Sequence, residues 1–409
     1  MAVSSNGTGV PPPLFSAEFQ QNPYPTYRHL RAGPRLQPLA ERPGAWLVFG
    51  YADCTALLRD DRLTSHRPAH ALVGATGDVL DEFAPLVSHM QRWLLQLDAP
   101  RHSLLRKLMN PGFSPSTVER LRPAIEAIVD RLLNQLESSI APDVIRQVAY
   151  PLPVQVISEM LGLPQELRQR CTELTNDLAN WFGNVLRTPE RARVAQTAIV
   201  ELEGYFAALI RERRRRRKDD LLGLMIDAAD HAKSLSAEEL YAQCVMMLFA
   251  GHETTRHLIG NGMNTLLSHP RTLAEVHSHP ELVPNAVEEL LRFESPVQAI
   301  PRGVKADIDF DGQVIPAGSS LVFMIGAAQR DPRQYDEPDQ LNVHRHHIRH
   351  LAFGADAHVC LGATLARLES QLAIGGLLRR FPTLALADDR PDWGSNFAIR
   401  GLNSLRVRL

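Results

Sequence analysis

The chain has 409 residues, 44% of them hydrophobic and 22% charged, so it can bury a large core and is not a purely disordered protein. Its 44 Lys and Arg residues nearly balance 46 Asp and Glu residues, and the formal net charge of -2 argues against a general nucleic-acid binder, which normally carries a basic surface. The longest apolar stretch of a predicted helix, 244–250, is far shorter than the roughly 20 residues that span a membrane. We therefore expect a soluble cytoplasmic protein that binds neither nucleic acid nor membrane.

The N-terminal residues carry neither the basic nor the apolar segment of a secretory signal. Residues 1–16, which include three consecutive prolines, predict a flexible lead-in, and residues 17–409 predict a single domain because no linker or internal repeat interrupts them. The cysteines are too scattered for a disulfide framework or a thiolate zinc site. Three of them are predicted to be small core residues: Cys54, Cys171 and Cys244.

Helical periodicity dominates the first half of the chain, although 46–49 predicts an early strand. The stretch 64–90 and Trp93 fit a mobile access loop, and they fit a loop with an anchor in the core equally well. After Ser114-Pro115, apolar residues recur every three or four positions, which predicts the buried face of one helix: Leu121, Ile125, Ile128, Leu132 and Leu136.

A longer helix is predicted to begin after Ser236, which forms a capping-box pattern with Glu239. No proline follows until Pro270, so this helix can run for about 32 residues, or roughly 48 Å. Its middle, 249–255, replaces apolar residues with a glycine, an acid and two β-branched alcohols, which fit a helix core poorly. This pattern indicates either a helix that reaches the surface or a place where a flat ligand approaches, with Thr254 bonding back to a carbonyl.

Later strand signals lie at the start of the last quarter of the chain. Residues 308–310 and 313–315 flank Asp311-Gly312, a two-residue turn signal that predicts a hairpin. An apolar strand is predicted at 320–325. The fold class is therefore mainly α with a minor β part.

One segment, 353–362, places Cys360 at the end of a glycine-containing loop and before a helix predicted by four leucines: Leu365, Leu368, Leu372 and Leu377. The dipole and the free N–H groups of a helix N-terminus favour a thiolate. Such a thiolate can be an axial metal ligand, or a nucleophile for which His358 is a conceivable base. These residues alone leave both hypotheses open.

Several segments, in the same order, resemble signatures of the cytochrome P450 superfamily in its soluble bacterial class I form. Residues 353–362 resemble the haem-ligand signature Phe-x-x-Gly-x-x-x-Cys-x-Gly, and 250–255 resemble the oxygen-activating stretch of the family's long central helix. The other similar segments are Glu289 to Arg292 with Arg345 as a third ion partner, 98–106 as a haem-propionate segment, and 327–332 as a strand end. The resemblance covers nearly the whole chain and implies the cytochrome P450 fold, with haem between the long helix and the helix after the cysteine loop.

The resemblance also implies haem b as cofactor and O2 as co-substrate, with Cys360 as the ligand to iron. Glu253 and Thr254 would relay protons to the dioxygen, and Gly251 would leave room for it. The haem-binding residues that the family motifs imply are His102, Arg106, Ala250, Gly251, Arg302, Phe353, His358, Cys360 and Gly362, of which the four basic ones would neutralise the propionates. Glu289, Arg292 and Arg345 would form a buried structural ion triad.

The chain departs from the family at Asp356, where glycine is usual. Asp is among the few residues that tolerate a left-handed φ, so we expect the loop to form, with the carboxylate facing solvent or perturbing the haem environment.

The implied function is a haem-thiolate monooxygenase that inserts one atom of O2 into a C–H or C=C bond of an apolar small molecule, such as a polyketide, a terpenoid or a fatty-acid-like compound. Electrons would come from a separate ferredoxin and its reductase, docking near Arg106, Lys107 and Arg367, and the protein is expected to be a monomer. By analogy, the residues expected to line the substrate pocket are Trp93, Leu248, Phe249, Val297, Ala299, Ile300 and Phe397. The alternatives are a haem-binding sensor or carrier without turnover, and a haem-free thiol enzyme that uses Cys360 and His358.

Three other patterns have simpler interpretations. His252-Glu253 is followed by Arg256 where the second histidine of a zinc-protease motif would stand, which argues against that motif. The histidines between 344 and 350 are predicted to lie in a solvated loop. The basic run 213–218 is predicted to end a helix, where cations are favoured.

Overall fold

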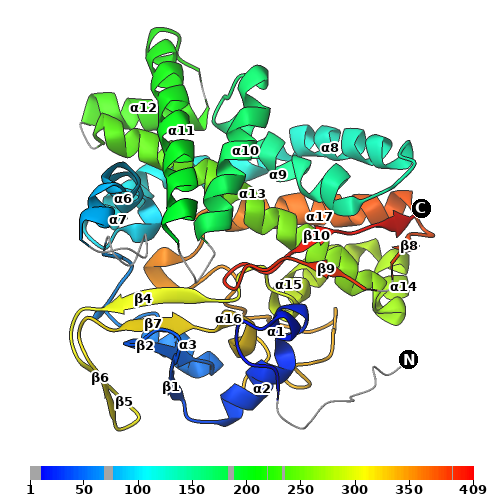
Figure 1. The fold of residues 1–409 in the computed structure, drawn as a ribbon. Helices are drawn as coiled ribbons and strands as arrows, with labels where there is room; N and C mark the ends of the chain where they lie inside the picture. The colour runs from blue at the N-terminus through cyan, green and yellow to red at the C-terminus, as the bar shows by residue number, and fades with distance from the viewer. Residues whose placement is uncertain (1–10, 69–76, 183–187, 219, 233–234, 389) are drawn as a thin grey trace.

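The computed structural model describes residues 11–68, 77–182, 188–218, 220–232, 235–388 and 390–409, and most of them are helical (Figure 1). The helices are α1 Ala17–Gln21, α2 Tyr24–Ala32, α3 Tyr51–Leu57, α5 Asp78–Asp81, α6 Ala84–Gln91, α7 Arg101–Met109, α8 Pro115–Glu137, α9 Pro151–Met160, α10 Gln165–Phe182, α11 Pro189–Arg215, α12 Leu221–Ala232, α13 Ala237–Leu267, α14 Pro270–Ser278, α15 Val283–Phe293, α16 Ile325–Ala328 and α17 Ala363–Arg380. The strands are β1 Leu36–Pro38, β2 Ala45–Val48, β3 Leu63–Thr64, β4 Ile300–Val304, β5 Ile308–Phe310, β6 Gln313–Ile315, β7 Ser320–Phe323, β8 Ala385–Leu386, β9 Asp392–Trp393, β10 Leu402–Ser404 and β11 Val407–Arg408. The mainly α fold with a minor β part is confirmed.

Helix α13 lies at the centre of the helical part and contacts α9, α10, α11, α15 and α17 (Figure 1). It begins as predicted, because Ser236 Oγ accepts the Glu239 N–H at 3.2 Å and Glu239 Oε2 accepts the Ser236 N–H at 2.9 Å. Its 31 residues correspond to a length of roughly 46 Å. A helix of this length can carry the residues of a functional site and also core residues that lie far from that site.

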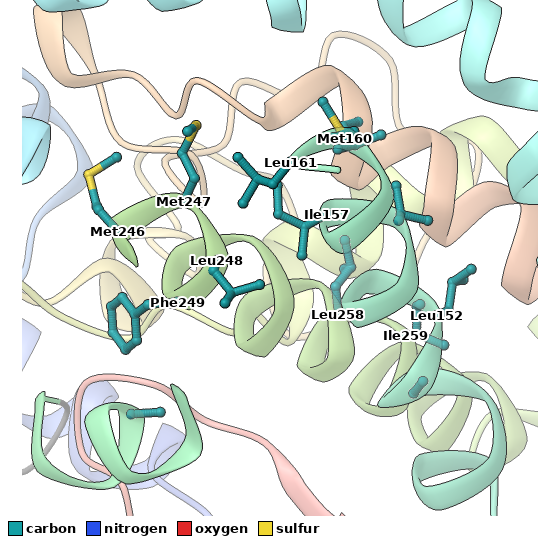
Figure 2. Packing of buried hydrophobic residues seen from close by; sticks show 14 of the residues in the cluster. Leu152, Ile157, Met160, Leu161, Met246, Met247, Leu248, Phe249, Leu258 and Ile259 are labelled. Atoms are coloured by element: carbon teal, nitrogen blue, oxygen red, sulfur yellow. The ribbon is translucent and has the colours of Figure 1, made fainter. Parts of the chain in front are cut away.

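The core around α13 is built mainly by aliphatic side chains. Figure 2 shows α9 beside α13, with Ile157 and Leu152 of α9 near Leu248 and Leu258 of α13. Helix α8 packs against α9 and α17, and its predicted face is buried except for the half-buried Leu121. Because α9 and α17 also contact α13, this packing fixes the position of α13 between them.

The largest sheet has the strand order β1-β2-β7-β4-β3. Strand β2 pairs with β7 in parallel, whereas β1–β2, β4–β7 and β3–β4 are antiparallel. The predicted strand at 320–325 ends at Phe323, because the chain turns at Met324 into α16. The sheet lies on the other side of α13 from α8, α10 and α11 (Figure 1).

The predicted hairpin is formed by β5 and β6, which pair in register from Ile308 with Ile315 to Phe310 with Gln313. Asp311 and Gly312 have φ of 57° and 75°, as a two-residue hairpin turn requires. The hairpin turn predicted from Asp311 and Gly312 is therefore confirmed.

The predicted N-terminal lead-in lies partly outside the described residues. In its described part, Thr26 Oγ1 donates to the Pro12 carbonyl at 2.7 Å, and the Phe15 ring lies 4.6 Å from that of Phe397. The division into a flexible lead-in, 1–16, and one domain, 17–409, stays a prediction. Residues 69–76 of the predicted access loop also lie outside the described residues.

Candidate functional site

The loop that carries Cys360 is closed by its own backbone. The Cys360 N–H donates to the Phe353 carbonyl at 2.7 Å, and α17 begins three residues later, after Gly362. Gly354 has φ of 73° and Asp356 has φ of 55°, so the loop needs left-handed backbone at the position where this chain has Asp. Asp356 is exposed, so its carboxylate faces solvent and the expectation that the loop forms around it is confirmed.

The Cys360 sulfur differs from that of the other cysteines. Cys54, Cys171 and Cys244 are buried, as predicted, whereas the Cys360 side chain is exposed. Protein atoms still surround the sulfur closely enough that burial raises the pKa of Cys360, against the opposing effects of the Gly362 N–H, Arg106 and Arg367. A bound metal cation removes such a proton by its own charge.

Four basic side chains gather on one side of this loop: His102 and Arg106 of α7, Arg302 of β4, and His358. The rings of His102 and His358 lie 4.1 Å apart, and His358 Nε2 lies 3.0 Å from Ser65 Oγ. Arg106 Nη1 donates to the Val359 carbonyl at 2.5 Å. The sequence motifs had placed all four at one edge of the predicted haem site, and the structure brings them together.

The electrostatics of this cluster suit an anionic ligand. Burial, with the nearby charges of Arg302 and His102, lowers the pKa of His358 to about 3, and burial lowers the pKa of Arg302 to about 10. Burial and Arg106 also lower the pKa of His102. The opposing carboxylate, Asp98, accepts hydrogen bonds from Thr64 Oγ1 and the Ser65 N–H. Arginine cations and imidazole N–H groups both donate to carboxylates, so this donor set fits the two propionates that a haem would place here.

On α13, three neighbouring positions in a buried stretch are only half-buried: Ala250, Gly251 and Thr254. Thr254 Oγ1 donates to the Ala250 carbonyl at 3.2 Å, which is the predicted back-bond. A Cβ on Gly251 would lie 3.3 Å from Cγ1 of Ile157, so close packing of α9 on α13 accounts for this glycine. Its predicted role beside dioxygen stays a prediction.

Glu253 lies buried among three donors. His257 Nε2 lies 3.1 Å from Oε2, Arg256 Nη1 donates to Oε1 at 3.1 Å, and His252 Nε2 lies 3.3 Å from Oε1. Burial would raise the pKa of Glu253, but hydrogen bonds from His252 and His257 outweigh it and hold the pKa well below its usual range. Arg256 is thus the acid's ion partner, and the described residues contain no cluster of three or more His, Cys, Asp or Glu side chains placed to hold a metal ion.

The predicted ion triad is formed. Arg292 Nε and Nη2 each donate to Glu289 at 2.7 Å, and both side chains are fully buried. Arg345 Nε lies farther away, 3.4 Å from Glu289 Oε2, and Arg345 Nη1 donates to the Asp336 carbonyl. The tight pair is therefore Glu289–Arg292, with Arg345 as a looser member.

The residues predicted for the substrate pocket separate into two groups. Trp93 and Phe249 lie with their ring centroids 5.2 Å apart, and Phe182, which the sequence analysis missed, lies 5.2 Å from Phe249 and 6.0 Å from Trp93. Trp93 and Leu248 are buried, so the core-anchor interpretation of Trp93 holds.

Two residues predicted for the pocket lie in another cluster. Ala299 and Phe397 belong to an N-terminal cluster, where Phe397 packs on Phe15 and Phe19, and their role in a pocket stays a prediction. Successive residues of extended chain point to opposite sides, so Ala299 is buried in that cluster while Ile300 is half-buried; Val297 is half-buried as well. Val297 forms an isolated bridge with Ile399, a residue that only the tertiary structure could identify.

The comparisons with known proteins are consistent along the chain. The family model "Cytochrome P450" matches residues 81–396. The chain is 36% identical over 401 residues to the polyketide biosynthesis cytochrome P450 PksS of Bacillus subtilis (strain 168), covering 96% of this chain and 97% of that protein. It is 38% identical to the cytochrome P450 monooxygenase PikC of Streptomyces venezuelae, covering 100% of this chain and 97% of PikC.

Among solved structures, that of P450BioI in complex with an acyl carrier protein ligated to hexadec-9Z-enoic acid is similar with a TM-score of 0.89. The two chains are 34% identical, and the match covers 96% of this chain and 100% of the other. Within the described ranges, no helix has both the length and the apolar character needed to cross a lipid bilayer.

Proposed function

Since this chain belongs to the cytochrome P450 family and is a haem monooxygenase, we propose that its substrate is an apolar, chain-like metabolite of the polyketide, terpenoid or fatty-acid class, and that a separate ferredoxin supplies its electrons. In this family haem b, held by a cysteine thiolate, activates O2, and one oxygen atom enters the substrate.

The aromatic group of Trp93, Phe182 and Phe249 carries the proposal on substrate class. It lies between α13 and the end of α10, where Trp93 and Phe249 are buried and Phe182 is half-buried. Apolar rings favour an apolar substrate, which gains free energy by leaving water. PksS is named for polyketide biosynthesis, and the P450BioI structure contains a hexadecenoic acyl group on its carrier, which supports a flexible aliphatic chain here.

Different residues of the chain would hold the cofactor, handle protons and exclude water. Cys360 would hold the iron, and His102, Arg106, Arg302 and His358 would hold the propionates, which orients the cofactor against α13. Thr254 would hold a proton on its hydroxyl at the half-buried face, and the ionised Glu253 would accept protons from His252 or His257 on the buried side and pass them on. The apolar rings would exclude water from the reacting carbon.

A spin-state titration tests the substrate class. We expect hexadecenoic acid or a macrolactone polyketide to shift the Soret band of the purified protein, and a free sugar of similar size to leave it unchanged. Turnover with NADPH, ferredoxin and ferredoxin reductase should then give a product with one added oxygen atom. A shift without any product would instead favour a binding protein, and a shift by polar compounds alone would contradict the apolar assignment.

Electron delivery has its own test. Of the three predicted docking residues, Lys107 is exposed, whereas Arg106 donates to the Val359 carbonyl and Arg367 pairs with Glu288. Lys107→Glu should therefore raise the KM for ferredoxin severalfold at low salt, and Lys305→Glu, at another exposed lysine, should not. An unchanged KM in Lys107→Glu would move the docking site away from α7.

A further inference from the structure

Two side chains contact the ring of Phe353, the residue whose carbonyl accepts the Cys360 N–H, and a third side chain binds both of them. Glu288 of α15 accepts two hydrogen bonds from Arg367 of α17, from Nε at 2.6 Å and from Nη2 at 2.9 Å. Glu288 Oε2 also lies 3.1 Å from Nε2 of His350. Arg367 Cζ lies 4.6 Å from the centroid of the Phe353 ring, and the His350 ring centroid lies 5.6 Å from it.

This arrangement makes Glu288 the common anchor of both groups that contact Phe353. The two hydrogen bonds to Arg367 use the planar fork of the guanidinium, which leaves its flat face against the ring. The His350 side chain is 3% exposed and that of Glu288 is 25% exposed, so neither moves freely. The cation of Arg367, whose side chain is 35% exposed, is therefore held against the Phe353 ring although part of it faces solvent.

The position of that cation matters at the sulfur. Arg367 Cζ lies 4.6 Å from the centroid of the Phe353 ring, and the Phe353 carbonyl accepts the Cys360 N–H, so this cation lies next to the loop that carries the sulfur. A positive charge near the iron also favours the added electron of the ferrous state, and the strength of this effect falls with distance. A residue that fixes the distance of Arg367 from the loop therefore also fixes how much this cation stabilises the ferrous state.

We propose that Glu288 is a positioning residue for the haem loop: it holds Arg367 and His350 against Phe353 and thereby raises the reduction potential of the iron bound to Cys360. The inference rests on membership of the haem-thiolate family and is independent of the substrate proposed above. A merely structural Glu288 would stabilise the contact between α15 and α17 without any effect on the potential.

Spectroelectrochemical titration of the purified haem protein measures that potential directly, with the ferrous carbon-monoxide spectrum as a second readout. Arg367→Met removes the cation, and Glu288→Asp keeps the negative charge but shortens the side chain so that it no longer reaches both partners. Arg367→Lys keeps the positive charge but loses the planar fork. Arg380→Met is the matched control, because Arg380 pairs with Glu137 at the far end of the same helix.

We expect Arg367→Met to lower the equilibrium constant of the one-electron reduction about threefold, a shift of about 28 mV to more negative potential at 59 mV per decade. Glu288→Asp and Arg367→Lys should shift the potential in the same direction, and Arg380→Met should not shift it. The double variant Glu288→Asp with Arg367→Met should have the potential of Arg367→Met alone, because Glu288 acts through Arg367.

Parental potentials in both Arg367→Met and Arg367→Lys would overturn the proposal, as would additive shifts in the double variant. If Glu288→Asp fails to retain haem, the comparison of Arg367→Lys with Arg367→Met decides: a potential restored by lysine would mean that charge alone matters and would refute the positioning role. Loss of substrate binding with unchanged potentials would count against the proposed substrate and also against this inference, whereas shifted potentials without turnover would support the inference alone.

Discussion

Gly401 packs directly on the imidazole of His257: a Cβ at position 401 would lie 1.6 Å from Nδ1 of that ring. The same ring holds Glu253 through its other nitrogen, at 3.1 Å. A residue near the C-terminus thus determines where the buried acid of α13 is held.

Gly401→Ala should destabilise the protein by about 1–3 kcal/mol, because the new methyl group forces the His257 ring away from Glu253. Gly204 is the control, since it lies exposed inside α11 with open space around it, and Gly204→Ala should stabilise the protein by roughly 0.5–1 kcal/mol. Urea unfolding followed by circular dichroism gives both values. Equal effects at the two glycines would show that the contact with His257 carries no cost.

Glu289→Ala should cost about 3–5 kcal/mol, because it leaves the fully buried guanidinium of Arg292 without its counter-ion. Arg345→Ala should cost clearly less, since Arg345 is partly exposed and 3.4 Å from the same carboxylate. The measurements are the free energy of unfolding and the haem content after purification. A loss in Arg345→Ala as large as in Glu289→Ala would contradict the ranking of the two contacts.

Thr254→Ala should keep the helix and the haem spectrum, because the back-bond to the Ala250 carbonyl contributes little to α13. With a turned-over substrate, product formed per NADPH consumed should fall at least about tenfold, since the proposed proton relay loses its hydroxyl on the half-buried face. Thr255→Ala, at the buried neighbour, is the control and should leave this ratio unchanged. Full coupling in Thr254→Ala would remove Thr254 from the proton relay.

Arg302→Met should weaken haem binding in the holoprotein but should not destabilise the apoprotein. Haem transfer to apomyoglobin should become about tenfold faster, because a charge-assisted bond to a propionate is lost. The apoprotein should be equally or more stable than the parent, since burial destabilises the Arg302 cation and lowers its pKa to about 10. Arg62→Met, at an exposed pair with Asp60, should change neither quantity. A less stable Arg302→Met apoprotein would show that burial of this cation carries no cost in the folded chain.

The features that could be predicted from the sequence depend on local chemistry. The Ser236 cap, the Asp311-Gly312 turn and the left-handed Asp356 each follow from one or two residues and the backbone that they favour. The ordered motifs likewise identified the basic cluster and the Glu289–Arg292 pair before any geometry was known.

The features that could not be predicted depend on which distant segments meet. Phe397 packs on Phe15 because of the path of the N-terminal segment, which no motif describes. Arg367 is held by Glu288, 79 residues away, so its engagement could not be inferred from its basic character.

The parallel pairing of β2 with β7 has a consequence for biosynthesis. Ala45 is in register with Ser320, so roughly 275 residues must be translated before β2 finds its neighbour, which takes about 14–55 s at ribosomal rates of ~5–20 residues per second. During this time the apolar strand segment Trp46-Leu47-Val48 has one edge without its partner strand β7. The nascent polypeptide is therefore expected to depend on a chaperone at this segment until β7, which ends at Phe323, has been translated.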